Sequence, residues 1–297
     1  MSYPLAAGLI IVSAVLFGLQ PWYGAELAGG QVDVNGMMLI RFALPALFVG
    51  AWLALKARPI PLTRAWPHAL LGVAFAFTGI GYYQAGYQIG FSLAVILFYS
   101  FPVLVTLYSA MALKKTLQPV QWLAVATATL GLLLAVDVPS NIQAPLAGVL
   151  WALLSACCYA FVLTFKSHYA PPVSEPISLL LLTLGATVTV LAYGLWQGIS
   201  LPATGVEWQW TLTLAIFAGL MPIALIMLGS PRTGATDSAT YCLIEPIVAV
   251  WVASHLAAED ISLRTLIGGA LVVLAALVLI RFRSNRQGLS ATAEIAQ

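Results

Sequence analysis

Two charged side chains lie deep within long apolar segments of this sequence. Glu245 precedes Pro246 near the middle of one segment, and Arg41 lies about two helical turns from the nearer end of another. Charge buried in lipid is unfavourable, and the residues that carry it usually belong to a functional pathway. Glu245 is therefore the candidate coupling residue of this chain, although a hydrogen bond to a neighbouring helix would also account for it.

Arg41 has a structural interpretation. Its long side chain can extend toward the nearer end of its segment, and Glu26 lies at a compatible depth in the preceding segment. We therefore expect a Glu26–Arg41 ion pair.

Hydroxyl, amide and aromatic side chains recur at helical spacing in other apolar segments. Trp151, Ser155 and Tyr159 follow one another at intervals of four residues, which keeps them on one face of a helix. Such side chains either line a water-filled cavity or form hydrogen bonds between helices. We predict a substrate cavity lined by Ser13, Gln20, Tyr82, Tyr99, Trp151, Ser155 and Tyr159.

Long apolar stretches must position these residues. Of the 297 residues, 61% are hydrophobic and 7% are charged. A soluble protein of this length would need more polar residues to cover its surface. About 20 apolar residues of helix cross a bilayer, so ten stretches are predicted to be transmembrane helices. They span 4–27, 34–56, 65–87, 90–112, 118–136, 145–167, 176–197, 208–229, 235–257 and 262–282.

The last five stretches repeat the pattern of the first five. An offset of 144 residues places Pro102 on Pro246 and sets Lys115 of one loop against Glu259 of another. Because five is odd, the second copy enters the membrane from the opposite side, as in transporters built from inverted repeats. Proline or glycine that interrupts corresponding helices of both halves indicates a transport site and its hinges. The predicted hinge residues are Gly79, Gly81, Pro102, Pro222 and Pro246.

The expected fold class is an all-α polytopic membrane protein, with ten transmembrane helices arranged as two inverted-topology five-helix repeats around a central cavity. One transmembrane domain covers 1–283, with repeat one at 1–138 and repeat two at 144–283, and a cytoplasmic tail covers 284–297.

The offset also bears on energy coupling. It maps Glu245 onto Phe101, which points about 200° away from Tyr99 around a helix. Either Glu245 faces a neighbouring helix or the two halves line the cavity differently. A proton-coupled carrier needs a titratable group that both substrate and proton can reach, and the face of Glu245 disagrees with that of Tyr99. We therefore expect substrate to move down its own gradient without an obligatory proton.

Basic residues give the orientation, because short cytoplasmic loops retain lysine and arginine. With the N-terminus inside, ten of the 12 Lys and Arg residues are cytoplasmic, whereas Glu207, Glu259 and Asp260 lie outside. The ten are Lys56, Arg58, Arg64, Lys114, Lys115, Lys166, Arg232, Arg281, Arg283 and Arg286.

The ninth and tenth stretches carry the most specific pattern in the chain. Leu243, Glu245-Pro246, Leu256, Glu259 and Ile267-Gly268-Gly269 follow the order L-x-E-P, L, E and I-G-G. In these residues, and over all ten stretches, the chain resembles the EamA-type branch of the drug/metabolite transporter superfamily. The first half departs from the pattern, because lysine stands where glutamate is common. The resemblance implies a cavity lined mainly by helices 1, 3, 4, 6, 8 and 9, and is greatest to bacterial exporters of aromatic and other amino acids.

Other classes of function are disfavoured. The three histidines lie near segment ends, and neither H-E-x-x-H nor G-x-S-x-G occurs, so no enzyme is expected. The three cysteines fall inside segments, which argues against a metal site, and we predict no cofactor. A channel would show rings of charge or a filter loop, and neither is visible in this sequence. The net charge of +2 follows from the loops, so nucleic acid is not an expected partner.

We therefore expect a secondary transporter of the bacterial cytoplasmic (inner) membrane, with both termini in the cytoplasm, that exports small amphipathic metabolites by alternating access. Amino acids, including aromatic ones, are the expected substrates. A broad exporter of lipophilic cations or drugs is the alternative, which the scarcity of acidic residues within the segments disfavours. The expected partners are the small-molecule substrate and the lipid bilayer, and a monomer is compatible with the sequence.

Overall fold

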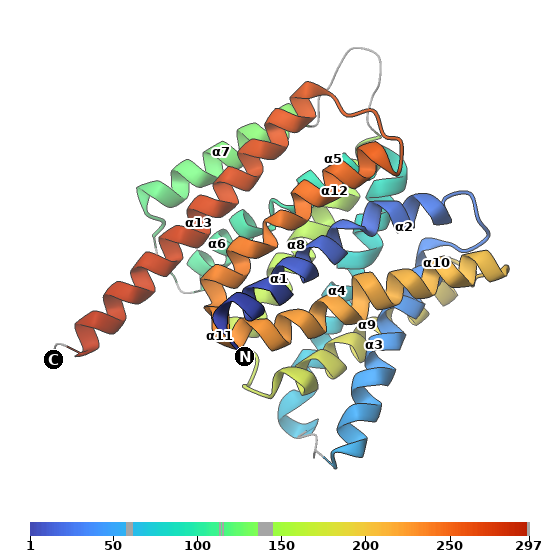
Figure 1. Ribbon diagram of the computed structural model, residues 1–297, viewed down its shortest axis with the longest axis horizontal. Helices are drawn as coiled ribbons and strands as arrows, with labels where there is room; N and C mark the ends of the chain where they lie inside the picture. Colours follow the sequence, from blue (N-terminus) through green and yellow to red (C-terminus); the bar gives the residue numbers. More distant parts are fainter. Residues whose placement is uncertain (58–61, 113, 115, 136–144, 296–297) are drawn as a thin grey trace.

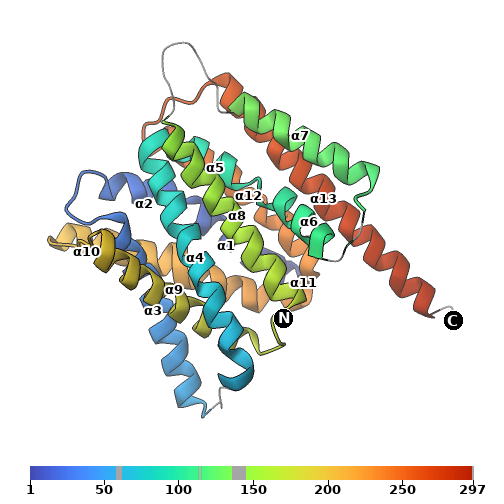
Figure 2. The ribbon, with the colours of Figure 1, turned by 180° about the vertical axis from the view of Figure 1, so that it is seen from behind.

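The structure is a computed structural model that describes residues 1–57, 62–112, 114, 116–135 and 145–295 (Figure 1, Figure 2). Over these ranges the chain is helical, and no strand occurs. The first half holds α1 (Tyr3–Gly18), α2 (Gln20–Leu27), α3 (Val34–Leu55), α4 (Leu62–Ile89), α5 (Phe91–Phe98), α6 (Phe101–Ala112) and α7 (Pro119–Ala135). The second half holds α8 (Leu146–His168), α9 (Glu175–Gln197), α10 (Gly205–Ala215), the π-helical turn η1 (Ile216–Leu220), α11 (Met221–Cys242), α12 (Ile244–His255) and α13 (Leu263–Ile295).

These helices form ten membrane crossings. Among the described residues, seven helical stretches are long and apolar enough to span a bilayer, and α7 is a shorter apolar helix. Three of the seven join consecutive helices: α1 with α2, α5 with α6, and α10 through η1 with the first part of α11. The other two crossings are α4 and the stretch from the end of α11 through α12, which starts after Gly234, whose φ is 77°. The expected all-helical membrane fold is confirmed.

The two halves enter this bundle from opposite ends. At one end, called the basic end here, the Nε atom of Arg232 donates to the carbonyl of Met1 at 3.0 Å. At the other, called the acidic end, the loop that carries Glu259 meets the N-terminus of α5. Helix α1 begins at the basic end, whereas α8 begins at the acidic end, where Gly148 packs against the last residues of α4. The second repeat is therefore inverted relative to the first.

Two crossings are broken at equivalent positions. Helix α5 ends at Phe98 and α6 begins at Phe101, while α11 ends at Cys242 and α12 begins at Ile244. The offset of 144 residues relates the two breaks, and a proline stands just after each of them, as the sequence indicated.

The predicted hinge glycines have a different setting. Helix α4 runs unbroken through Gly79 and Gly81. A Cβ atom at Gly79 would lie 2.7 Å from the sulfur of Met38, and one at Gly81 would lie 2.8 Å from the carbonyl of Trp151. Both glycines thus allow close helix packing. The equivalent crossing of the second half is not regular, because η1 interrupts it directly before Pro222.

Small residues bring the helices together. Helix α4 packs against α8 and α9, α1 packs against α11 and α12, and α7 packs along α13 at one edge of the bundle (Figure 1, Figure 2). A Cβ atom at Gly72, Gly131 or Gly229 would lie 2.5–2.7 Å from a backbone atom of α9, α13 or α1. Close backbone contact of this kind drives association of helices in lipid, where burying apolar surface gives little.

Candidate substrate cavity

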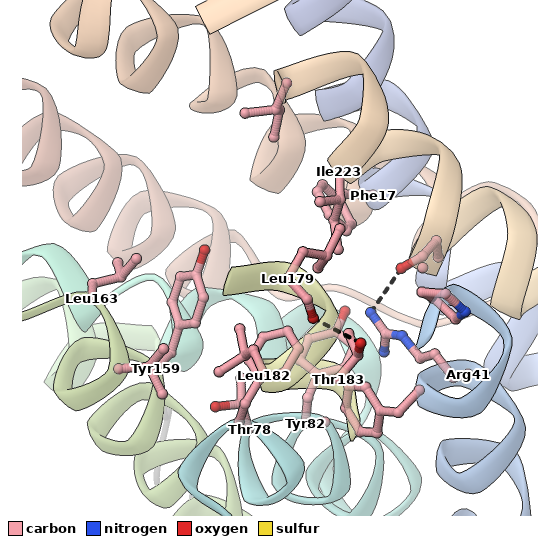
Figure 3. Close-up of a pocket in the computed structure, with 18 of the residues that line it drawn as sticks. Phe17, Arg41, Thr78, Tyr82, Tyr159, Leu163, Leu179, Leu182, Thr183 and Ile223 are labelled. Atoms are coloured by element: carbon pink, nitrogen blue, oxygen red, sulfur yellow. Dashed lines mark hydrogen bonds between the residues drawn. The ribbon is translucent and has the colours of Figure 1, made fainter. Parts of the chain in front are cut away.

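A cavity of about 370 Å³ lies inside the helix bundle (Figure 3). This volume is in the range typical of binding sites for small molecules. It is bordered by α1 to α6, α8, α9, η1, α11 and α12, so the second and seventh crossings contribute in addition to the six that the family resemblance implied. Apolar and aromatic side chains form most of its wall. The polar and charged lining side chains are Gln20, Arg41, Thr78, Tyr82, Tyr99, Tyr159, Lys166, Glu175, Ser178, Thr183 and Glu245.

Four of the seven predicted lining residues border this cavity, namely Gln20, Tyr82, Tyr99 and Tyr159, and so does the candidate coupling residue Glu245. They come from five different crossings, and only the fold brings them together.

The other three predicted lining residues lie in contacts between helices. Ser13 is fully buried, and its hydroxyl donates to the carbonyl of Pro222 at 2.9 Å. The fully buried hydroxyl of Ser155 donates to the carbonyl of Thr78 at 2.6 Å. Trp151 packs against the apolar cluster of α4, α5 and α8. For these residues the alternative of interhelical packing and hydrogen bonding describes what the structure shows.

Tyr99 and Glu245 share the cavity despite their different positions on an ideal helix. Tyr99 lies in the break between α5 and α6, so the helical phase of α5 does not carry over to Phe101. The Tyr99 hydroxyl donates to the carbonyl of Cys242 at 3.2 Å and lies close enough to the Glu245 carboxyl to interact with it. Because Pro246 has no N–H, the Cys242 carbonyl lacks its α-helical donor, and Tyr99 supplies one.

The expected Glu26–Arg41 ion pair is wrong. Glu26 is exposed at the acidic end and accepts a hydrogen bond from the indole of Trp22 at 3.0 Å. Arg41 instead turns into the cavity, where its Nη2 atom donates to the carbonyl of Ala218 at 2.9 Å, as Figure 3 shows. Its guanidinium carbon also lies 5.8 Å from the ring centre of Tyr83, within the range of a cation–π interaction.

The carbonyl that receives Arg41 belongs to the irregular part of the eighth crossing. Ala218 lies in η1, four residues before Pro222, so its carbonyl also lacks an α-helical donor. Two prolines of the second half thus each deprive a carbonyl of a cavity-lining residue of its α-helical donor, and a polar side chain of the first half donates to each.

One group of aromatic rings lies on the side of the cavity away from Arg41. Figure 3 shows Tyr159 opposite Arg41. The Tyr159 ring lies 4.9 Å from that of Phe101 and 5.4 Å from that of Phe98, measured between ring centres. Glu245 is close enough to interact electrostatically with both Arg41 and Tyr159. The cavity therefore presents a guanidinium and a carboxyl group beside an aromatic wall.

The two ends of the cavity differ. Toward the acidic end, the hydroxyls of Tyr83 and Tyr87 donate to carbonyls of α2 at 3.4 and 3.1 Å, and the rings of Trp22 and Trp210 meet at 5.2 Å. Toward the basic end, the lining reaches the ion pair of Lys166 and Glu175, at 2.7 Å, whose side chains are 33% and 63% exposed. The cavity thus approaches the surface at the basic end and is closed by aromatic rings at the acidic end.

The acidic end also holds a carboxylate whose role sequence reasoning missed. The two oxygens of Glu259 accept hydrogen bonds from the N–H groups of Phe91 and Ser92 at 2.6 and 2.9 Å. Glu259 therefore caps the first turn of α5 and joins the two repeats. Its place in the family pattern was the signal that could have indicated such a role.

In the part of the chain that the structure describes, no three His, Cys, Asp or Glu side chains come together.

Comparison with known proteins relates this chain to membrane transporters. Residues 4–136 and 146–281 each match the EamA-like transporter family, one match for each repeat. An "Uncharacterized transporter" of Archaeoglobus fulgidus is 26% identical over 281 residues, which covers 94% of this chain and 96% of that protein. A solved structure titled "Crystal structure of protein" superposes with a TM-score of 0.61 at 18% identity, covering 93% of this chain and 96% of the other, and shows the same fold. The chain belongs to the EamA-like transporter family and is a multi-pass membrane transporter.

Proposed function

We propose that this transporter exports small amphipathic metabolites, amino acids and among them aromatic ones, across a bacterial cytoplasmic membrane by alternating access. One observation carries the proposal: the cavity combines a guanidinium, a carboxyl group and an aromatic wall. An amino acid with an aromatic side chain presents the complementary set, namely a carboxylate, an ammonium group and a ring.

The direction of transport follows from the orientation that we propose. Lysine and arginine in short loops favour the cytoplasmic side, so the basic end faces the cytoplasm. The cavity approaches the surface at that end, through Lys166 and Glu175. A substrate from the cytoplasm could enter this conformation. Exchange with the opposite conformation would require the aromatic contacts at the acidic end to separate.

The alternative, export of lipophilic cations, has one feature in its favour. Glu245 and the tyrosines around it could hold a cation. Arg41 opposes this function, because its positive charge faces the same cavity, where little water screens it.

Counterflow in proteoliposomes distinguishes the two. Vesicles loaded with unlabelled phenylalanine should accumulate labelled phenylalanine or tryptophan in a saturable manner, and protein-free vesicles should not. Tetraphenylphosphonium should compete poorly. Saturable counterflow of tetraphenylphosphonium, without counterflow of any amino acid in a labelled panel, would contradict the proposed substrate and support the alternative.

A further inference from the structure

We propose that Arg41 is the anchor for the carboxylate of the substrate, which it binds by exchanging its hydrogen bond to the Ala218 carbonyl. The inference rests on the proposed function and extends it, because it assigns one group of the substrate to one residue of the cavity.

The guanidinium of Arg41 has more donors than the protein satisfies. It carries five N–H groups in a planar fork. Among the described side chains and carbonyls, one oxygen accepts from it, that of Ala218, and the sulfur of Met38 lies 4.0 Å from its Nη1 atom. No carboxylate of the described residues forms an ion pair with Arg41 within 4 Å. A buried charge in this position is unfavourable until an anion pairs with it.

A carboxylate would complete these contacts. Arginine and carboxylate form two parallel hydrogen bonds that are shorter and stronger than a bond to a neutral carbonyl. The incoming carboxylate would thus outcompete the Ala218 carbonyl. Ala218 lines the cavity, so a water molecule can replace Arg41 as the donor to its carbonyl.

Other residues of the cavity fit the ammonium group and the side chain of an amino acid whose carboxylate binds Arg41. Arg41 and Glu245 both line the cavity, and no ion pair within 4 Å joins them. A carboxylate at Arg41 would place the ammonium group toward Glu245 and Tyr99. The side chain would then point to Tyr159 and the phenylalanines beside it.

The exchange also connects binding with the irregular helix. In the free protein, Arg41 connects α3 to η1 through the Ala218 carbonyl, four residues before Pro222. Once the substrate takes Arg41, this tie is lost. Arg41 is therefore both the carboxylate anchor and a contact that holds α3 against the eighth crossing while the cavity is empty.

Three ligands separate the contribution of the carboxylate from that of the ring. Phenylalanine has both charged groups, phenethylamine lacks the carboxylate, and 3-phenylpropionate lacks the amine. Affinities would be measured by equilibrium binding to the purified full-length protein, for wild type, Arg41→Gln, Arg41→Lys and Arg232→Gln. Arg232 is a matched control, because it contacts the Met1 carbonyl at the basic end, outside the cavity.

We expect Arg41→Gln to weaken phenylalanine and phenylpropionate at least tenfold while phenethylamine binds equally well or more tightly. Arg41→Lys should retain part of the preference for phenylalanine over phenethylamine, and Arg232→Gln should change no affinity. Retained phenethylamine binding also shows that the variant is folded.

Two results overturn the inference. If Arg41→Gln weakens all three ligands by the same factor, or leaves phenylalanine unchanged, Arg41 does not hold the carboxylate. If the wild-type protein binds none of the three ligands, the proposed function itself is wrong and the anchor falls with it.

Discussion

Replacing Glu259 with alanine tests how the acidic end is held together. The carboxylate accepts two backbone hydrogen bonds, at 2.6 and 2.9 Å, from the first turn of α5, which follows Gly90 at φ 82°. Loss of a charged acceptor at a helix N-terminus costs about 0.5–2 kcal/mol for the cap and about 0.3–1 kcal/mol for the interaction with the helix dipole. We therefore expect Glu259→Ala to lower the free energy of unfolding by about 2 kcal/mol. Glu259→Gln keeps one acceptor oxygen, so about 1 kcal/mol should be lost.

Thermal unfolding of the purified protein in detergent measures this effect. A loss of about 2 kcal/mol should lower the melting temperature by roughly 4–8 °C. Asp260→Ala is the matched control, because Asp260 is the next residue and is exposed. A melting temperature of Glu259→Ala equal to that of Asp260→Ala would refute the assigned role of the carboxylate.

Three further predictions concern the cavity, the packing and the topology. Tyr159→Ala should weaken phenylalanine binding by on the order of 1 kcal/mol, about fivefold, because Tyr159 lines the cavity. Trp151→Ala should lower thermal stability more than it lowers affinity. If Trp151→Ala weakened binding and Tyr159→Ala lowered only stability, the lining described here would be contradicted. Gly268→Val should destabilise the protein by about 1–3 kcal/mol or more, since its Cβ would meet the carbonyl of Gly131, whereas Gly8→Val faces open space and should be neutral in melting temperature. A cysteine at Asp260 should react with an impermeant reagent only from the side opposite an N-terminal tag, and same-side labelling would exclude the inverted orientation.

The fold could be predicted because its main signals are local. Apolar stretches of membrane length and the repeated prolines indicate ten crossings in two copies without any knowledge of contacts. Where a helix breaks is also local, since Pro102 and Pro246 each follow a break. The inversion follows from the odd number of crossings in each repeat.

The site was predictable only in part, because helical phase does not survive a break. An ideal helix separates Tyr99 from the position equivalent to Glu245, yet both side chains reach the cavity because the chain leaves the helix at Tyr99. Ser13 and Ser155 have the spacing of lining residues, but donate to carbonyls of neighbouring helices. Sequence spacing alone cannot distinguish these two roles.

The role of Arg41 depends on contacts between distant segments. Part of this role can be inferred from the sequence. A proline deprives the carbonyl four residues earlier of its α-helical donor, so Pro222 indicates that the Ala218 carbonyl needs another donor. Which side chain donates to that carbonyl depends on the packing of α3 against η1. That contact joins residues 177 positions apart in the chain and becomes apparent only in the structure.

A structure of the protein with 4-bromophenylalanine bound tests the central claim most directly, because the anomalous signal of the bromine marks the position of the ring independently of how the ligand is fitted. We predict a bromine peak beside Tyr159, Phe98 and Phe101, with the carboxylate of the ligand on the guanidinium of Arg41. A bromine peak outside the cavity, or one beside Arg41 with the carboxylate turned toward the aromatic wall, would contradict the account.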